Sequence, residues 1–191
     1  MTMTMRHRIH TLFFFMVISL LASRAAFAGD ALIRDIVVTN SSTDLLLFLK
    51  VDNLFSPEII DGVESGLDAT LKFEIRINLV RTGWPDKEIY NNRIEHSLGY
   101  DTLKREYRLT LVENGPEQST YDNLKKAELL MTELNGVKLL PLHSMQPDRQ
   151  YVLKVRAIMS QTALPSYVHY LIPFANLWNV KTNWYTVRFR Y

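Results

Sequence analysis

The 191-residue chain has no cysteine, so it can form no disulfide and offers no thiol nucleophile or thiolate metal ligand. Its folded form must therefore be stabilised by its core alone. Histidine is also scarce: beyond residue 28 only His96, His143 and His169 occur, without HxxxH or HExxH spacing. We therefore expect no bound metal. Because His96 lies among apolar residues of a predicted strand, we expect it to be a hydrogen-bonded core residue.

Glycine is scarce as well, with seven residues and no two at the spacing of a Walker or dinucleotide-binding loop. No GxSxG motif is present for a serine hydrolase. We expect no cofactor and no catalytic residue. A hydrolase based on two carboxylates remains a third possibility for function, because any two of the 20 Asp and Glu side chains could meet in the fold.

The chain lacks a hydrophobic run long enough to span a bilayer, which takes about 20 residues. Its main apolar run, Leu12–Ala22, follows Arg6 and Arg8 and precedes the small-residue site Ala26–Ala28. This order predicts a cleaved signal peptide over residues 1–28, and hence a periplasmic or secreted protein. The alternative is a retained segment that anchors the protein in the inner membrane.

Neither sign of charge dominates residues 29–191, which hold 19 Lys or Arg and 20 Asp or Glu. The basic residues are scattered along the predicted strands and form no block in the sequence. Nucleic-acid binding is therefore not expected, and membrane association is expected only through an uncleaved leader. The length of residues 29–191 predicts a single β-rich domain with one core.

Alternation of apolar and polar residues, which is typical of half-buried strands, recurs along the chain. The clearest run extends from Leu71 to Leu79, while Ala31–Thr39 is apolar on both faces and predicts a fully covered strand. The polar run Glu88–Tyr100 predicts a strand with a bulge or at a sheet edge. Shorter alternating runs lie at 45–51, 107–111, 151–159 and 185–189, and turn residues that indicate an antiparallel meander lie at 82–86, 100–103, 114–116 and 146–148.

Two short helices are predicted between the strands. Ser56 and Pro57 are typical of an N-cap and first helical position, and Gly66 lies near the end of that helix. The second is predicted from a capping box at Ser119 to a stop at Asn135-Gly136. These elements predict a mainly β fold, an antiparallel β-sandwich of seven or eight strands, immunoglobulin-like in outline, with two peripheral helices. In the first helix, the acidic residues Glu58, Asp61 and Glu64 are expected on the solvated face. In the second helix, Asp122 belongs to the capping box, and an apolar stripe extends from Leu124 to Leu134.

Aromatic residues form the candidate surface for binding a ligand or a partner. Trp84 lies in a predicted turn, where a large side chain is part exposed, and Trp178, Trp184 and Tyr185 border an aromatic-rich connection over residues 164–183. Such rings either form a platform for a sugar or peptide or close the open end of a sheet sandwich.

Several short motifs follow one another in a fixed order over nearly all of residues 29–191. In chain order they are Leu54-Phe55-Ser56, Ser65-Gly66, Tyr100-Asp101-x-Leu103, Tyr107, Leu164-Pro165, Trp178 and Trp184. This ordered set resembles the bacterial exported family called domain of unknown function 4390 (DUF4390). The resemblance implies a proteobacterial envelope protein of β-rich fold with no established activity, and a role as a signalling accessory. It implies structural roles for the motif residues and no catalytic ones.

These observations lead us to expect a non-catalytic module that binds another envelope protein or assists signalling. An exposed strand edge could recruit such a partner by strand addition. The alternative is a periplasmic module that binds a small ligand or carbohydrate through Trp84, Trp178 and Trp184.

Overall fold

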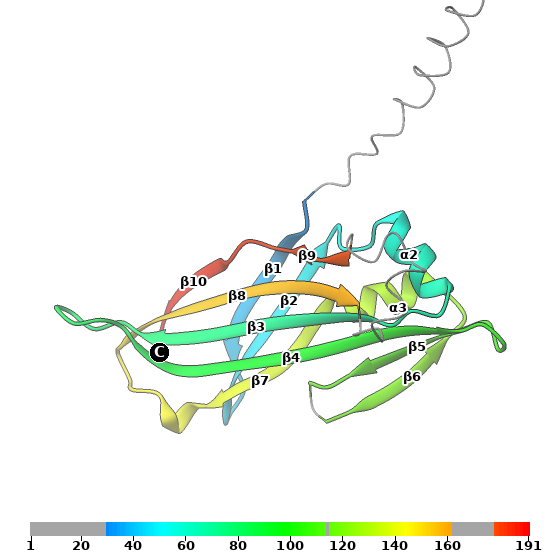
Figure 1. Ribbon diagram of the computed structural model, residues 1–191. Coiled ribbons are helices and arrows are strands. Elements are labelled where there is room, and N and C mark those ends of the chain that lie inside the picture. Colours follow the sequence, from blue (N-terminus) through cyan, green and yellow to red (C-terminus); the bar gives the residue numbers. More distant parts are fainter. Residues whose placement is uncertain (1–29, 114, 162–177) are drawn as a thin grey trace, which may run out of the picture.

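A computed structural model describes residues 30–113, 115–161 and 178–191. In these residues two antiparallel sheets, of three and seven strands, are accompanied by two short helices, which confirms the mainly β fold (Figure 1). The predicted leader and the motif Leu164-Pro165 lie outside the described residues. The immunoglobulin-like outline is not confirmed, because the ten strands divide seven to three instead of four to three.

The larger sheet is organised around β3, which pairs with β4 on one side and β8 on the other. Its alternation places Leu71, Phe73 and Ile75 on the core face, fully buried, as the sequence predicts. The strand order is β10-β8-β3-β4-β5-β6, with β9 beside β8. The strands are β3 (Ala69–Leu79), β4 (Lys87–Asp101), β5 (Glu106–Leu111), β6 (Glu117–Tyr121), β8 (Gln150–Gln161), β9 (Val180–Lys181) and β10 (Tyr185–Arg190).

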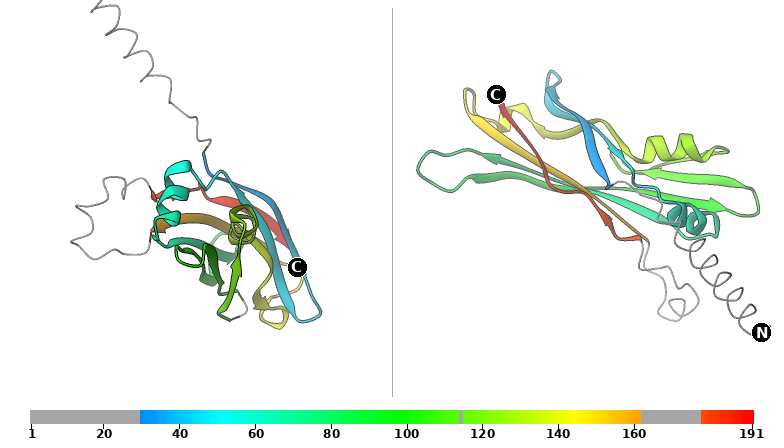
Figure 2. Two further views of the ribbon diagram at one scale, coloured as in Figure 1. Left: turned by 90° about the vertical axis from the view of Figure 1, so that its right-hand side faces the viewer. Right: turned by 90° about the horizontal axis from the view of Figure 1, so that it is seen from above.

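The smaller sheet supplies the other wall of the core. It has the order β1-β2-β7 and lies on one side of the larger sheet (Figure 2). Buried residues of both sheets form one apolar cluster, in which β2 contributes Leu45, Leu47 and Leu49. Its strands are β1 (Leu32–Asn40), β2 (Asp44–Asp52) and β7 (Glu133–Pro141), and the short 3-10 helix η1 (Leu142–Ser144) follows β7.

The predicted meander and bulge are both present. Strands β3, β4, β5 and β6 are sequential neighbours, and the turn that contains Trp84 joins β3 to β4. In the pairing of β3 with β4, Ile77 is opposite Tyr90 and Asn78 is opposite Glu88, so Ile89 is the extra residue. Figure 1 shows this hairpin extending beyond the other strands.

The first helix forms where the sequence predicts it, as α2 (Pro57–Glu64). The Ser56 hydroxyl accepts a hydrogen bond from the backbone N–H of Ile59 at 3.4 Å, which caps the helix. Its acids are exposed, as predicted. Trp178 packs against α2 at Gly62, where a Cβ atom would collide with the indole ring.

The second helix is shorter than predicted. It forms α3 (Leu124–Met131), and its N-cap is Asn123, whose side-chain oxygen accepts a hydrogen bond from the N–H of Lys125 at 2.8 Å. Ser119 belongs instead to strand β6, and Asn135-Gly136 belongs to strand β7. The prediction was wrong at both ends because pairing with β5 and β2 outweighs the helical spacing of a few apolar residues.

The prediction that Ala31–Thr39 is fully covered is also wrong. Strand β1 is an edge strand that pairs only with β2, and Ile33 is its only buried residue. A bulge interrupts the pairing between Arg34 and Val37, and Asp35 adopts a positive φ of 51° there. Such a bulge is a common way to blunt an exposed edge.

The contact of Gly62 with Trp178 predicts the effect of Gly62→Ala. In an ordinary helix this substitution would stabilise the protein by about 1 kcal/mol. Here the added methyl group overlaps the indole ring, so we expect a loss of about 1–3 kcal/mol in the free energy of unfolding, measured by urea denaturation.

The control for this prediction is the same substitution in a Trp178→Leu background. Removal of the ring should convert the loss into a gain of about 1 kcal/mol. An equal loss in both backgrounds would show that the ring is not the cause.

Candidate functional site

The outer face of the larger sheet, defined as the outward side chains of β3, β4, β8, β9 and β10, carries many charged residues. Residues that pair directly across antiparallel strands share a face. The register therefore gathers charges that are scattered in the sequence. The outer face holds Lys72, Arg76, Arg93, Lys154, Arg156, Lys181, Arg188 and Arg190 against Glu74, Glu88, Glu95 and Asp101.

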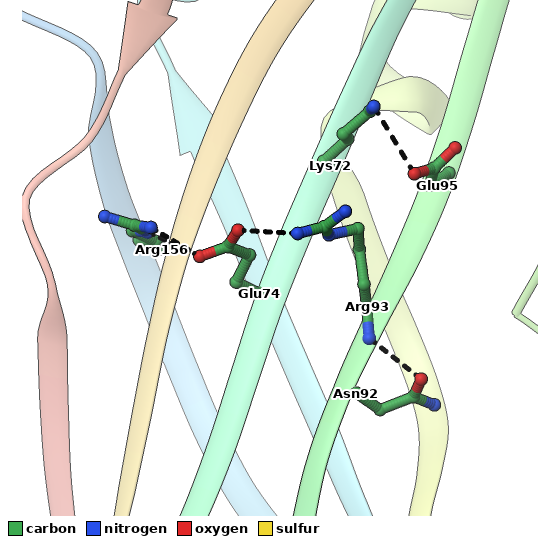
Figure 3. Close-up of polar contacts among 6 residues, drawn as sticks. All are labelled: Lys72, Glu74, Asn92, Arg93, Glu95 and Arg156. Atoms are coloured by element: carbon green, nitrogen blue, oxygen red, sulfur yellow. Dashed lines mark hydrogen bonds and ion pairs between the residues drawn. The ribbon is translucent and has the colours of Figure 1, made fainter.

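Glu74 lies at the centre of this face, between two arginines from the neighbouring strands (Figure 3). Its Oε2 accepts a hydrogen bond from Nε of Arg156 at 2.7 Å and forms an ion pair with Nη2 of the same residue at 2.6 Å, and its Oε1 accepts a hydrogen bond from Nη2 of Arg93 at 3.1 Å. Burial alone raises the pKa of the Glu74 carboxyl, but Arg156 and Arg93 outweigh burial and hold the pKa below its ordinary value. The network therefore joins β8, β3 and β4 across the sheet.

Trp184 extends the network towards the sheet edge. The guanidinium group of Arg156 lies 4.5 Å from the centre of its ring, and that of Arg76 lies 5.1 Å away. Cations at these distances are attracted to an indole ring. Trp184 remains 37% exposed, so the cluster of Glu74, Arg156, Arg76 and Trp184 is an ordered part of the protein surface.

The predicted aromatic surface is divided by the fold. Trp84 is 75% exposed at the β3–β4 turn, and Tyr185 is exposed at the start of β10, whereas Trp178 is 2% exposed and packs on α2. Trp178 therefore closes the core, which was one of the two uses predicted for these rings. Trp184 was predicted, but its partners Arg76 and Arg156 were missed. The pair of Arg156 with Glu74 was also missed, because these two residues are 82 positions apart in the chain.

The family-like motif residues occupy structural positions. Leu54 is buried beside the start of α2, Phe55 packs partly on the core, and Ser56 caps the helix. Asp101 accepts hydrogen bonds at 3.0 Å from the backbone N–H groups of Leu103 and Lys104, and so shapes the β4–β5 turn. These bonds, the one from Lys104 above all, lower the pKa of the Asp101 carboxyl.

Two tyrosines of the same motifs connect that turn to α2. The rings of Tyr100 and Tyr107 lie 4.8 Å apart, and the Tyr107 hydroxyl donates a hydrogen bond to Glu64 at 2.6 Å. Burial first, and then the nearby Glu64 carboxylate, raise the pKa of Tyr107. The tyrosine therefore stays a hydrogen-bond donor that ties β5 to the helix.

His96 is confirmed as a hydrogen-bonded core residue, with 0% exposure. Its Nδ1 lies 2.7 Å from the carbonyl oxygen of Met131, which can only accept, so Nδ1 carries a proton. Its Nε2 lies 3.0 Å from Oε1 of Glu113 but forms no hydrogen bond with it. The ring joins β4, the end of α3 and the segment after β5.

Beside Glu113 the surface has a hollow of about 240 Å³. Two carboxylates, those of Glu113 and Glu117, take part in its lining, and one of them is already directed at His96. In the described ranges no group of three or more His, Cys, Asp or Glu side chains could hold a metal ion. No helix of those ranges is long and apolar enough to cross a membrane.

The structure thus defines a mainly β domain of two sheets with a charged outer face and structural motif residues. A family model, Domain of unknown function (DUF4390), matches residues 28–188, and the chain belongs to this family. No curated protein matches the chain, and neither does any solved structure.

The ion pairs of Glu74 predict a change in acid stability. Because its pKa in the folded protein is lower than the ordinary value of 4.5, its stabilising contribution is complete above about pH 4.5 and is lost as the pH falls through the lowered pKa. We expect Glu74→Gln to reduce the free energy of unfolding by about 1–2 kcal/mol at pH 7.

Unfolding by urea between pH 7 and pH 2 measures this difference, which should shrink as the pH falls. Glu95→Gln is the matched control, because Glu95 is half-exposed and lies 3.6 Å from Lys72, so its loss should change stability little. A constant gap between wild type and Glu74→Gln at every pH contradicts the assignment.

Proposed function

We propose that the protein is an exported, non-catalytic module that binds another envelope protein by strand addition to a free edge of β4. The leader-like sequence of residues 1–28 supports the envelope location. The observation that supports the binding mode is the incomplete pairing of β4, the longest strand of the described residues.

Strand β4 has 15 residues, and β3 pairs along nearly all of it. On its other side, β5 pairs only with residues 96–101. On the side away from β3, the stretch from Lys87 to Glu95 therefore has no neighbouring strand among the described residues (Figure 1). From Tyr90 to Glu95 this edge is free of the bulge at Ile89, and it is long enough to pair with an extended peptide.

The end of the free edge carries a feature that could give specificity. The last residue pair between β4 and β5 is His96 with Leu111, and Leu111 also lines the hollow beside Glu113 and Glu117. A strand that extends the line of β5 along β4 would end next to this hollow. In strand addition, backbone hydrogen bonds supply affinity while such pockets select side chains, and here two carboxylates favour a basic one.

The tryptophan-based alternative has less support. Trp178 is buried, and Trp184 is flanked by the guanidinium groups of Arg76 and Arg156, so a ligand would have to compete with them. Trp84 remains exposed by itself at the end of a hairpin.

Neighbouring residues of the free edge allow a matched test. Asn92 pairs with Ile75 and shares the core side of the sheet, while Asn91 pairs with Arg76 on the outer face, and both are exposed. An inward-pointing charge on an edge blocks strand addition. We expect Asn92→Lys to abolish partner binding and Asn91→Lys to preserve it, with stability changes within about 0.5 kcal/mol for both.

Photo-crosslinking in living cells, with the probe at Lys87, measures binding directly. The proposal predicts a discrete protein adduct in wild type and Asn91→Lys, and its loss in Asn92→Lys. A probe at Lys104, in the β4–β5 turn, should give no adduct. The proposal fails if the adduct is equally strong in both lysine variants or from Lys104.

A further inference from the structure

The chain contains no acidic residue after Asp148. This acid-free segment forms β8, β9 and β10, which lie together at one side of the larger sheet. Their outward cations form an array that we call the cationic strip. It consists of Lys154, Arg156, Lys181, Arg188 and Arg190, whereas the outward charges of β3 and β4 are three basic and four acidic side chains.

Most of the cationic strip is not neutralised by the protein. Arg156 is engaged with Glu74, but Lys154, Lys181, Arg188 and Arg190 form no ion pair with any described residue. All four residues are exposed. A group of unneutralised cations on one face favours an anionic partner.

Acidic residues approach the cationic strip at one end. Lys181 of β9 lines a hollow together with Asp30 and Ser56, and the helix α2 that follows Ser56 carries Glu58, Asp61 and Glu64. The remaining free cations, Lys154, Arg188 and Arg190, lie on β8 and β10, where β8 pairs with β10 instead of β9.

We propose that the cationic strip docks on a bilayer that carries anionic phospholipid headgroups. The strip lies on adjacent strands of one sheet, so its cations project from one face and can approach a lipid surface together. Trp184, which lies beside Arg156 just before β10, is 37% exposed, and such an aromatic side chain is favoured at membrane–water interfaces. This association is additional to any contribution of the leader.

The strength of this docking follows from the number of free cations. Each Lys or Arg near an anionic bilayer strengthens binding about fivefold. The four unpaired members of the strip therefore provide a preference of several hundredfold for anionic over neutral vesicles at low ionic strength. Salt should reduce the preference, because the charges are exposed and screened.

The experiment compares the full chain on vesicles of phosphatidylglycerol with phosphatidylcholine and on vesicles of phosphatidylcholine alone, by co-sedimentation. The ratio of the two binding constants removes any contribution of the apolar leader, which is common to both. The test variant is Lys154→Gln/Arg188→Gln/Arg190→Gln. The control is Lys104→Gln/Lys125→Gln/Lys138→Gln, which changes the net charge equally at exposed sites away from the strip.

We expect the ratio to fall about a hundredfold in the test variant, at about fivefold for each of three charges, and to change less than threefold in the control. Circular dichroism verifies that both variants fold. An equal fall in both variants would show that the preference for anionic vesicles depends on net charge alone, and it would overturn the proposal. A ratio near one for wild type, with a protein adduct from a photo-crosslinker at Thr186, would assign the strip to an acidic protein and also overturn it.

Discussion

The pairing of β3 with two neighbours is the constraint on which the rest of the structure depends. Along its 11 residues β3 has β4 on one side and β8 on the other, so its register is fixed by two sets of backbone hydrogen bonds. A slip of one residue would expose Phe73 and Ile75 and bury Glu74. The core and the outer face are thus two consequences of one alternation.

Both proposed binding surfaces are consequences of the same register. The outer face is charged because β8 and β10 continue the alternation of β3, which places Arg156 beside Glu74 and Arg188 at the sheet margin. The free edge exists because β4 is longer than β5. The motif residues act differently, since Ser56 and Asp101 shape a helix start and a turn. The motif residues stabilise the scaffold, whereas charged residues, most of them outside the motifs, form the outer face.

The sequence predicts what depends on neighbouring residues. The alternation of β3, the start of α2 at Ser56-Pro57 and the burial of His96 could be read from a few adjacent positions. The exposure of β1 and the early end of α3 at Met131 could not, because both depend on which strand pairs with which. The candidate site is of the second kind, since Glu74 meets Arg156 only through the register of β3 with β8.

Amide hydrogen exchange followed by NMR is the most direct test of this account. It predicts that the amides of β3 exchange only through global unfolding, as expected of a strand paired on both sides. From Lys87 to Glu95, the amides that point away from β3 should exchange rapidly and their alternate neighbours slowly, while residues 96–98, which have β3 on one side and β5 on the other, are all slow. Uniform protection from residue 87 to residue 98, or exchange of β3 as rapid as that of β1, would contradict the account.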